Sequence, residues 1–394
     1  MIFTKHATLF LVSTFGIISV AADGGGIRAL DKGGKKGKKS KGDRRGPNLV
    51  DRKAGKFVSQ TINICEGEDP DADDIPCFEN GVIDAVAGPQ AGINVTEGYD
   101  SGEITVIDGG VVVEPITSTF LEAGLCPVNV HWHTGAEHTS AGEYDCTTRE
   151  CGPTGKGTGR RVLSKYGLLD KKADGTHRGL SDDDGPDRQG FRCSHYDKND
   201  PKFTKPYHFK FCSKEMTVGE TYEVHWPHGS FGACNTPSQY QTPFYKGLFC
   251  NLGRAGLSFP EDVINGKISS QTVASNFALQ GQVYTIVNDE NYYYPDLFRG
   301  MITGVKDFGK DIAVYLGSST GSDRDNTICS KYAPITWQMD RKCHLISASS
   351  FDKLCADMLS QTPTDMTADV APKGARLLVD DSLSDSNVKT LNLN

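Results

Sequence analysis

The residues best suited to chemistry are concentrated in one ten-residue stretch, NVHWHTGAEH at 129–138, which holds three histidines and a glutamate. The stretch is typical of a β-strand. His131 and His133 are two positions apart, so both imidazoles should lie on one face of that strand while Trp132 points to the other. Two histidines placed in this way can chelate one metal ion. Because such pairs also occur by chance, the hypothesis requires a third ligand.

A second strand-like stretch, YEVHWPH at 222–228, offers His225 as that ligand. Glu223 stands two positions earlier and shares its face, where a carboxylate can accept the ring N–H that a metal leaves free. Asn129 stands in the same relation to His131. Three neutral imidazoles without a fourth protein ligand are typical of an open catalytic zinc site. The alternative for His225 is a hydrogen-bonded histidine of the core.

The elements that must position these histidines are mainly strands, because short alternating apolar runs are separated by glycine and proline turns. Expected strands cover residues 102–108, 128–133, 220–226, 282–289, 312–316 and 335–339. The best helical stretch is short, at 351–360. The predicted fold class is therefore mostly β, a single large mixed or antiparallel β-sheet domain with long loops and few short helices.

Composition divides the 394-residue chain into four segments. Residues 1–22 have a lysine, a short apolar run and a small-residue end, which predict a signal peptide. Residues 23–56 form a basic, Gly/Lys-rich segment that cannot bury enough apolar surface to fold alone. The catalytic domain is expected at 57–360 and a polar C-terminal tail at 361–394. No later apolar stretch is long enough for a transmembrane span.

The basic segment bears on partners and location. Residues 28–45 are strongly basic within a chain of net charge −8. This pattern fits an electrostatic tether to a cell wall or other anionic surface and, equally, a solubilising or processed pro-segment. A signal peptide predicts the secretory pathway, with an extracellular, periplasmic or cell-surface location expected and an internal membrane-bound compartment or a plastid as the alternatives. That route argues against nucleic acid as a partner.

The cysteines agree with an oxidising compartment. Their number, 12, is even, and disulfides explain them better than a thiolate metal site. Cys146 with Cys151 and Cys193 with Cys212 are candidate local pairs. Asn94, in the sequence Asn-Val-Thr, is a candidate glycosylation site.

Three stretches together resemble a known family. CPVNVHWHTGAEHTSAGEYD at 126–145, GFRC at 190–193 and VGETYEVHWPHGSFGAC at 218–234 are similar to the delta-class carbonic anhydrases of diatoms and other marine phytoplankton. The likeness runs discontinuously over about residues 60–360. A fainter resemblance to the alpha-class carbonic anhydrases implies a fold of that type. The resemblance also implies an enzyme that reversibly hydrates carbon dioxide to bicarbonate and a proton.

The resemblance further assigns roles to residues. It implies that His131, His133 and His225 hold Zn²⁺, with cobalt or cadmium as possible substitutes. Asn129 and Glu223 would orient ligand rings. Zinc bound by three histidines lowers the pKa of its water to about 7, as is established for carbonic anhydrase itself.

Two more residues would act on the nucleophile. VYLGSSTGSD at 314–323 is similar to the alpha-class segment whose threonine orients the zinc-bound hydroxide, which would be Thr320. Glu137 would accept the Thr320 hydroxyl proton and so aim the nucleophile. Gly321 and Ser322 replace the threonine and proline expected after Thr320, so an ordinary strand-end threonine is the alternative. For Glu137, the alternative is a turn or salt-bridge carboxylate.

The proton shuttle and the carbon dioxide pocket have several candidates each. A histidine suits proton transfer to solvent because its pKa lies near neutrality. The candidate shuttle residues are His138, His195, His208 and His228, and the candidate apolar wall residues are Val224, Trp226, Val283 and Ile286. The alternative for most of the wall candidates is an ordinary core residue.

Two other classes of protein compete with this interpretation. A cupin-type metalloenzyme would use His131, His133 and Glu137 as ligands, often for iron or manganese. The distinguishing fact is whether Glu137 touches the metal. A non-catalytic secreted protein that binds zinc or a cell wall is the third hypothesis.

Overall fold

The computed structural model describes the central part of the chain and a few strand pairs before it. The described residues are 50–51, 56–57, 75–76, 95–96, 105–107, 111–137, 143–144, 146, 149–153, 190–213, 216–236, 238–242, 244–249, 262, 267–317, 328–329, 335–361 and 366–374. The predicted signal peptide and basic segment, the Asn94 side chain, His138 and Thr320 lie outside them.

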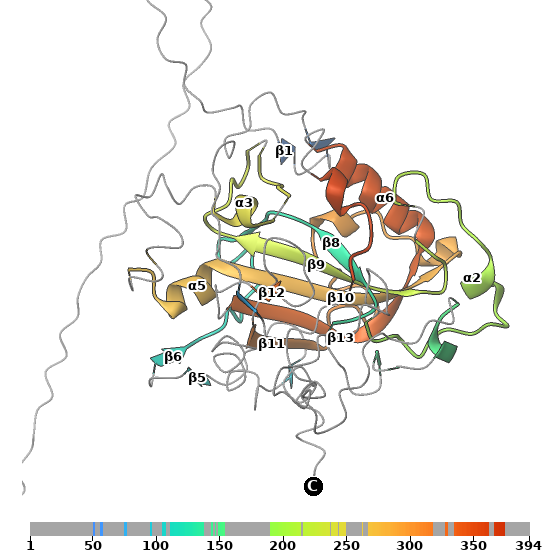
Figure 1. Cartoon of the computed structure of the whole chain (residues 1–394), viewed down its shortest axis with the longest axis horizontal. Coiled ribbons are helices and arrows are strands. Elements are labelled where there is room, and N and C mark those ends of the chain that lie inside the picture. Colours follow the sequence, from blue (N-terminus) through green and yellow to red (C-terminus); the bar gives the residue numbers. More distant parts are fainter. Residues whose placement is uncertain are drawn as a thin grey trace, which may run out of the picture. The chain divides into compact units, whose positions relative to one another are not determined.

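One seven-stranded sheet carries His131, His133, Glu223 and His225 on two of its strands; Figure 1 shows the arrangement of its main strands. Its strand order is β4–β11–β13–β10–β9–β7, and β8 also pairs with β9. The strands are β4 (Val95–Thr96), β7 (Cys126–Pro127), β8 (His131–Thr134), β9 (Thr221–Gly229), β10 (Phe277–Val287), β11 (Ile312–Gly317) and β13 (Ile335–Ser347). Strands β10 and β13 run parallel and the other pairs are antiparallel. The prediction of a mostly β, mixed-sheet domain is confirmed.

The remaining described elements are short. Two-stranded pairs are formed by β1 (Val50–Asp51) with β2 (Lys56–Phe57), β3 (Ile75–Pro76) with β12 (Ile328–Cys329), and β5 (Thr105–Ile107) with β6 (Val111–Val113). The α-helices are α2 (Pro201–Thr204), α3 (Phe244–Phe249), α5 (Ser270–Asn276) and α6 (Ala348–Leu359). The 3₁₀ turns are η1 (Arg149–Cys151), η4 (Glu290–Tyr292), η5 (Leu297–Arg299) and η6 (Thr367–Asp369). No helix in the described part is long and apolar enough to cross a membrane.

Two predicted boundaries differ from the structure, one because of a contact far away in the chain and one because of a local N-cap. The strand expected at 128–133 is broken, because Val128 donates its N–H to Pro227 beside β7 and regular pairing resumes only at His131. The helix expected at 351–360 begins earlier, at Ala348. Its start is set by Ser347, whose hydroxyl accepts the N–H of Ser350 as an N-cap.

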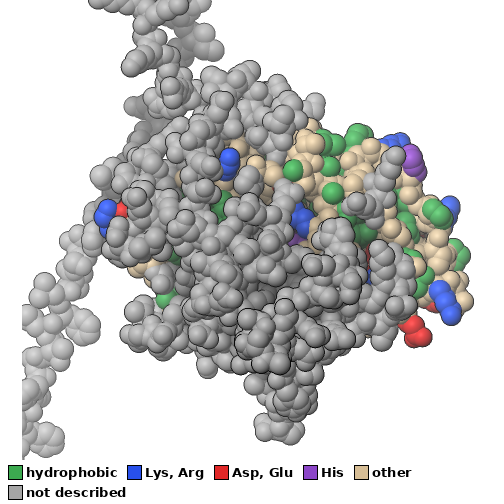
Figure 2. Space-filling view, viewed as in Figure 1, with side chains coloured by type: hydrophobic (Ala, Val, Ile, Leu, Met, Phe, Trp, Pro, Cys, Tyr) green, Lys and Arg blue, Asp and Glu red, His purple; other side chains and the backbone are tan. Residues whose placement is uncertain are grey.

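The largest apolar core lies on the sheet face opposite the histidines. Trp132, Val224 and Trp226 belong to it, and Phe351 of α6 packs edge-on against the Trp132 ring at 5.7 Å. Alternation along β8 and β9 therefore separates an apolar face, covered by α6, from a polar one. On the side seen in Figure 2, the described side chains are hydrophobic groups interspersed with polar and charged ones.

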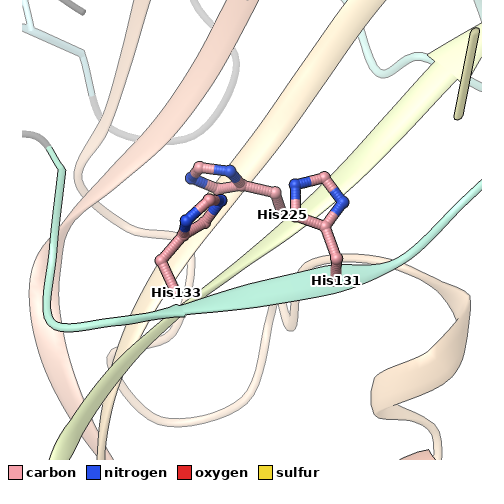
Figure 3. A group of neighbouring side chains, drawn as sticks. All are labelled: His131, His133 and His225. Atoms are coloured by element: carbon pink, nitrogen blue, oxygen red, sulfur yellow. The ribbon is translucent and has the colours of Figure 1, made fainter. Parts of the chain in front are cut away.

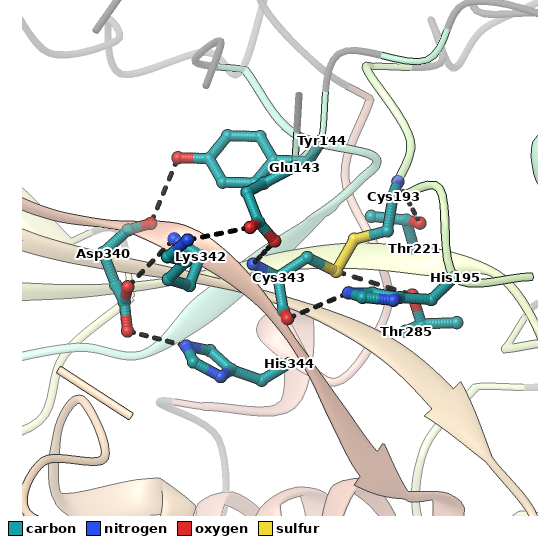
Figure 4. Close-up of a disulfide and its surroundings, with 10 residues drawn as sticks. All are labelled: Glu143, Tyr144, Cys193, His195, Thr221, Thr285, Asp340, Lys342, Cys343 and His344. Atoms are coloured by element: carbon teal, nitrogen blue, oxygen red, sulfur yellow. Dashed lines mark hydrogen bonds and ion pairs between the residues drawn. A yellow bond between two sulfur atoms is a disulfide. The ribbon is translucent and has the colours of Figure 1, made fainter. Parts of the chain in front are cut away.

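Disulfides connect distant parts of the chain. The predicted local bridge Cys146–Cys151 is present. The candidate pair of Cys193 with Cys212 is wrong. Cys193 bonds Cys343 on β13 (Figure 4), and Cys212 bonds Cys355 on α6. A further bridge joins Cys126 to Cys234. Proximity in sequence failed as a guide because the folded sheet and α6 bring each cysteine to a partner about 150 residues away.

The chain after residue 360 does not lie wholly outside the core, contrary to expectation. Met366 and Asp369 are buried, at 0% and 1% exposure. Lys373 then pairs with β8, donating its N–H to Trp132 O and accepting the N–H of Thr134, both at 2.8 Å. Residues 366–374, called the C-terminal segment below, thus lie against the strand that carries His131 and His133.

Candidate metal centre

Strand register brings the three predicted histidine ligands together. In the antiparallel pairing of β8 with β9, His131 lies directly opposite His225 and His133 lies opposite Glu223. Directly opposed residues share a face, so all four side chains project to the same side of the sheet. The three imidazoles converge (Figure 3), with ring centroids 4.8 to 5.4 Å apart. Their ligand atoms lie within 4.8 Å of one another, as a group that can hold a metal ion.

For His131 and His133, hydrogen bonds determine which ring nitrogen is available to bind a metal ion. His131 Nδ1 lies 2.8 Å from Asn129 Oδ1, and His133 Nδ1 lies 2.9 Å from the carbonyl oxygen of Gly374. Both partners only accept, so each Nδ1 must carry the proton. Nε2 of each ring then keeps a lone pair, which is the form a metal requires.

Two buried glutamates lie beside the third histidine. Glu223 Oε1 is 3.4 Å from Nε2 of His225, and Glu137 Oε2 is 3.9 Å from Nδ1. Glu137 also places Oε1 3.3 Å from Nδ1 of His133 and donates its backbone N–H to Glu223. The nearer of the two carboxylates, that of Glu223, favours a proton on Nε2, which would leave Nδ1 of His225 for an ion.

Aromatic groups border the cluster. The Phe244 ring is stacked on His131 at a centroid distance of 6.0 Å, and the Trp337 ring packs edge-on against His225 at 5.1 Å. Two of the predicted wall residues, Val224 and Trp226, belong instead to the core on the opposite face.

Ile286 also lies in that opposite core, so for three of the four wall candidates the alternative, an ordinary core residue, holds. Val283 is the exception, since it pairs with Glu223 and shares the histidine face. Gly281 stands directly opposite His225 and beside Met339. A Cβ at this glycine would lie 2.4 Å from Met339 Sδ. The absence of a side chain at Gly281 therefore leaves the space that Met339 occupies beside His225.

The described shuttle candidates differ in exposure. His228 is buried, and its Nδ1 donates to the carbonyl of Trp226 at 2.7 Å. Burial lowers the pKa of His228 to about 4, so it is unsuited to carry protons to solvent near neutral pH. His195 and His208 are exposed.

Sequence reasoning missed several residues around the cluster. These are Gly374 and Asp369 in the C-terminal segment, with Phe244 and Trp337 among the aromatic groups. The C-terminal segment shows no strand alternation, and its pairing to β8 depends on a contact more than 230 residues away. The one apolar pattern in this segment that indicates packing against the core is Met366 and Val370, which are four positions apart.

Fold and site together define a class: a mostly β protein with three convergent histidines on one sheet face. The family model for Delta carbonic anhydrase matches residues 122–350, more than half of the chain. The chain therefore belongs to the delta carbonic anhydrase family and is an enzyme that hydrates carbon dioxide, a small-molecule substrate. Searches of curated proteins and of solved structures found no match.

Proposed function

We propose that His131, His133 and His225 hold one zinc ion, and that the enzyme uses it to interconvert carbon dioxide and bicarbonate. The observation that carries this proposal is the convergence of the three rings, with acceptors beside them (Figure 3). His131 and His133 each have one ring nitrogen hydrogen-bonded to an acceptor, and the Glu223 carboxylate lies 3.4 Å from Nε2 of His225.

The donor set fits zinc. Three neutral imidazoles, with no fourth histidine or cysteine in their group among the described residues, match the open tetrahedral sites of catalytic zinc. When bound, zinc supplies a water molecule acidic enough to be a hydroxide nucleophile near neutral pH. Cobalt and cadmium accept similar ligands and are the expected substitutes.

Glu137 and Thr320 would orient the attacking oxygen. Glu137 is buried and its carboxylate is fixed beside His133 and His225. A carboxylate there can accept a hydrogen bond from the hydroxyl group of Thr320. The threonine oxygen would then act as the hydrogen-bond acceptor for the nucleophile. Phe244 and Trp337 supply apolar surface for carbon dioxide beside the histidines.

The cupin alternative loses support from the position of Glu137. Among the described residues, the set that contains His131 and His133 and could hold a metal ion has His225 as its third member. Glu137 belongs to a different set, together with Glu223 and His225. A cupin ligand set would need Glu137 together with both paired histidines. Family membership likewise disfavours a non-catalytic zinc or cell-wall protein.

For the remainder of the chain, we propose that residues 1–22 direct secretion, that Asn94 is glycosylated, and that the basic stretch 28–45 tethers the enzyme to an anionic surface. Deletion of residues 23–56 tests the tether. Turnover should remain near that of the full chain while retention on anionic cell-wall material falls. Loss of turnover would contradict the assignment.

The zinc proposal is tested by measuring bound metal and carbon dioxide hydration for His225→Ala and for His228→Asn as a control. Both positions are buried on β9, but only His225 belongs to the cluster. His225→Ala should lose zinc and hydration together, and His228→Asn should keep both. Retention of zinc and rate by His225→Ala would overturn the ligand assignment.

A further inference from the structure

We propose that Asp369 in the C-terminal segment is a positioning residue of the metal centre, acting through Asn129 on His131. The inference rests on the proposed zinc site. It assigns a role to a segment beyond residues 122–350, the part matched by the family model.

The contacts of Asp369 set the orientation of the Asn129 amide. Asn129 donates from Nδ2 to Asp369 Oδ2 at 2.9 Å and to the carbonyl of Gln241 at 2.8 Å. Thr242 Oγ1 donates to the same carboxylate oxygen, and Lys373 Nζ lies 2.5 Å from the other. Asp369 is therefore a buried acceptor whose charge is paired. Two acceptors facing one side of the Asn129 amide fix its NH₂ group on that side.

That orientation determines the tautomer of His131. With its NH₂ group held by Asp369 and Gln241, Asn129 can present only its oxygen to Nδ1 of His131, 2.8 Å away. The Nδ1 proton then stays in place and Nε2 keeps its lone pair. A reversed amide would offer an N–H to Nδ1 and favour the tautomer protonated at Nε2, which cannot bind a metal through Nε2.

The same segment reaches a second ligand. Lys373 pairs through its backbone with Trp132 and Thr134, on either side of His133, and the next residue, Gly374, accepts from the His133 ring. The side chain of Lys373 meanwhile pairs with Asp369. One nine-residue segment thus supports two of the three proposed ligands, and Lys373 links the two supports.

The test is a double-mutant cycle with Asp369→Ala, Asn129→Ala and both together. Zinc affinity is measured by competition with a chelator, and the ¹⁵N shifts of the His131 ring are measured in the metal-free protein. Loss of such an outer partner typically weakens metal binding by about 10- to 100-fold. We expect that range for each single variant, and the double variant should bind no more weakly than Asn129→Ala because both act along one chain.

The ring shifts separate positioning from general destabilisation. Wild type should show a proton on Nδ1 of His131, whereas Asp369→Ala should show a mixture of tautomers. Asp352→Ala is the matched control, since Asp352 is a buried carboxylate on α6 that accepts backbone N–H groups of Lys210 and Phe211. It should lower the melting temperature while the tautomer and zinc affinity stay as in wild type.

The inference would be overturned if Asp369→Ala had the zinc affinity and the His131 tautomer of wild type. It would also be overturned if the losses of zinc affinity from Asp369→Ala and Asn129→Ala were additive in the double variant. Should Asp369→Ala fail to fold, Asp369→Asn provides the same comparison, with an expected loss of about tenfold because one acceptor oxygen remains. A wild type that binds no zinc would contradict the proposed function instead. The metal-free tautomer would still decide the role of Asp369.

Discussion

At the scale of single residues, the centre is defined by the acceptors that surround its imidazoles. Asn129 offers an amide oxygen, Gly374 a backbone carbonyl and Glu223 a carboxylate. Each acceptor stabilises a proton on one ring nitrogen and so leaves the other nitrogen basic. The proposed zinc affinity therefore depends on these partners as well as on the histidines.

Glu223 provides a direct test of this dependence. Glu223→Ala should weaken zinc binding by about 10- to 100-fold, the usual effect of removing such a partner. Glu223→Gln keeps an acceptor oxygen in the same place and should lose less. Titration of both metal-free variants with zinc measures the difference, and equal affinities for alanine and wild type would refute it.

Thr320 should influence rate and leave metal binding alone. For Thr320→Ala we expect a full complement of zinc and a fall in carbon dioxide hydration of about 100-fold, as for loss of one preorganised hydrogen bond in a transition state. Stopped-flow kinetics with metal analysis checks both. A near-normal rate would remove Thr320 from the site.

His228 makes stability depend on pH. Burial lowers its pKa from 6.5 to about 4, so between these values the unfolded chain takes up a proton that the folded chain refuses. The contribution of neutral His228 to the free energy of unfolding is fully present above pH 6.5. It is lost progressively as the pH falls toward 4, by at most about 3 kcal/mol.

Unfolding of His228→Asn from pH 7 to pH 4 tests this effect. The variant should show a shallower loss of stability than wild type, because it removes the titrating group. His208→Asn, at an exposed position, is the matched control and should follow wild type. Identical profiles for all three proteins would contradict the role of His228.

At the scale of elements, one row of residues crosses four strands at the centre. His131 on β8, His225 on β9, Gly281 on β10 and Met339 on β13 are successive partners. Alternating polarity predicted the faces of β8 and β9 because their other sides are the fully apolar Trp132, Val224 and Trp226.

The glycine in this row should be sensitive to a single methyl group. Gly281→Ala places a Cβ 2.4 Å from Met339 Sδ, which is buried, so the variant should lose about 1–3 kcal/mol of stability. Adding Met339→Ala frees that space, and the double variant should regain part of the loss. Chemical denaturation measures both. Additive destabilisation in the double variant would show that the close contact is not the cause.

Other element-level features could not be read from local sequence. The break between β7 and β8 results from the approach of Pro227, and the C-terminal segment is held by pairing with β8. Both depend on contacts between residues far apart in the chain, and neither leaves a local periodicity. His131 and His133 could be predicted as ligands because their spacing is local, and His225 because it lies in a strand-like stretch with Glu223. Asp369 and Gly374 have no such local signal.

At the scale of the whole molecule, disulfides close long loops around the sheet. Cys193–Cys343 spans 150 residues and Cys146–Cys151 spans 5. In the chain-entropy view, a crosslink stabilises by restricting the unfolded chain, by about 5 kcal/mol for the longer loop and about 2 kcal/mol for the shorter one.

Paired serine replacements test that difference. The Cys193→Ser, Cys343→Ser double variant should lose more stability than the Cys146→Ser, Cys151→Ser double variant. Thermal unfolding of the two proteins under one set of conditions measures it. A larger loss for the short bridge would contradict the loop-length explanation.

The central claim is that one zinc ion, held by His131, His133 and His225, makes the chain a carbonic anhydrase. The most direct measurement is stopped-flow carbon dioxide hydration during titration of the metal-free protein with zinc. The rate should rise in proportion to added zinc and reach a plateau at one ion per chain. A full rate without metal, or no hydration at one bound zinc per chain, would contradict the claim.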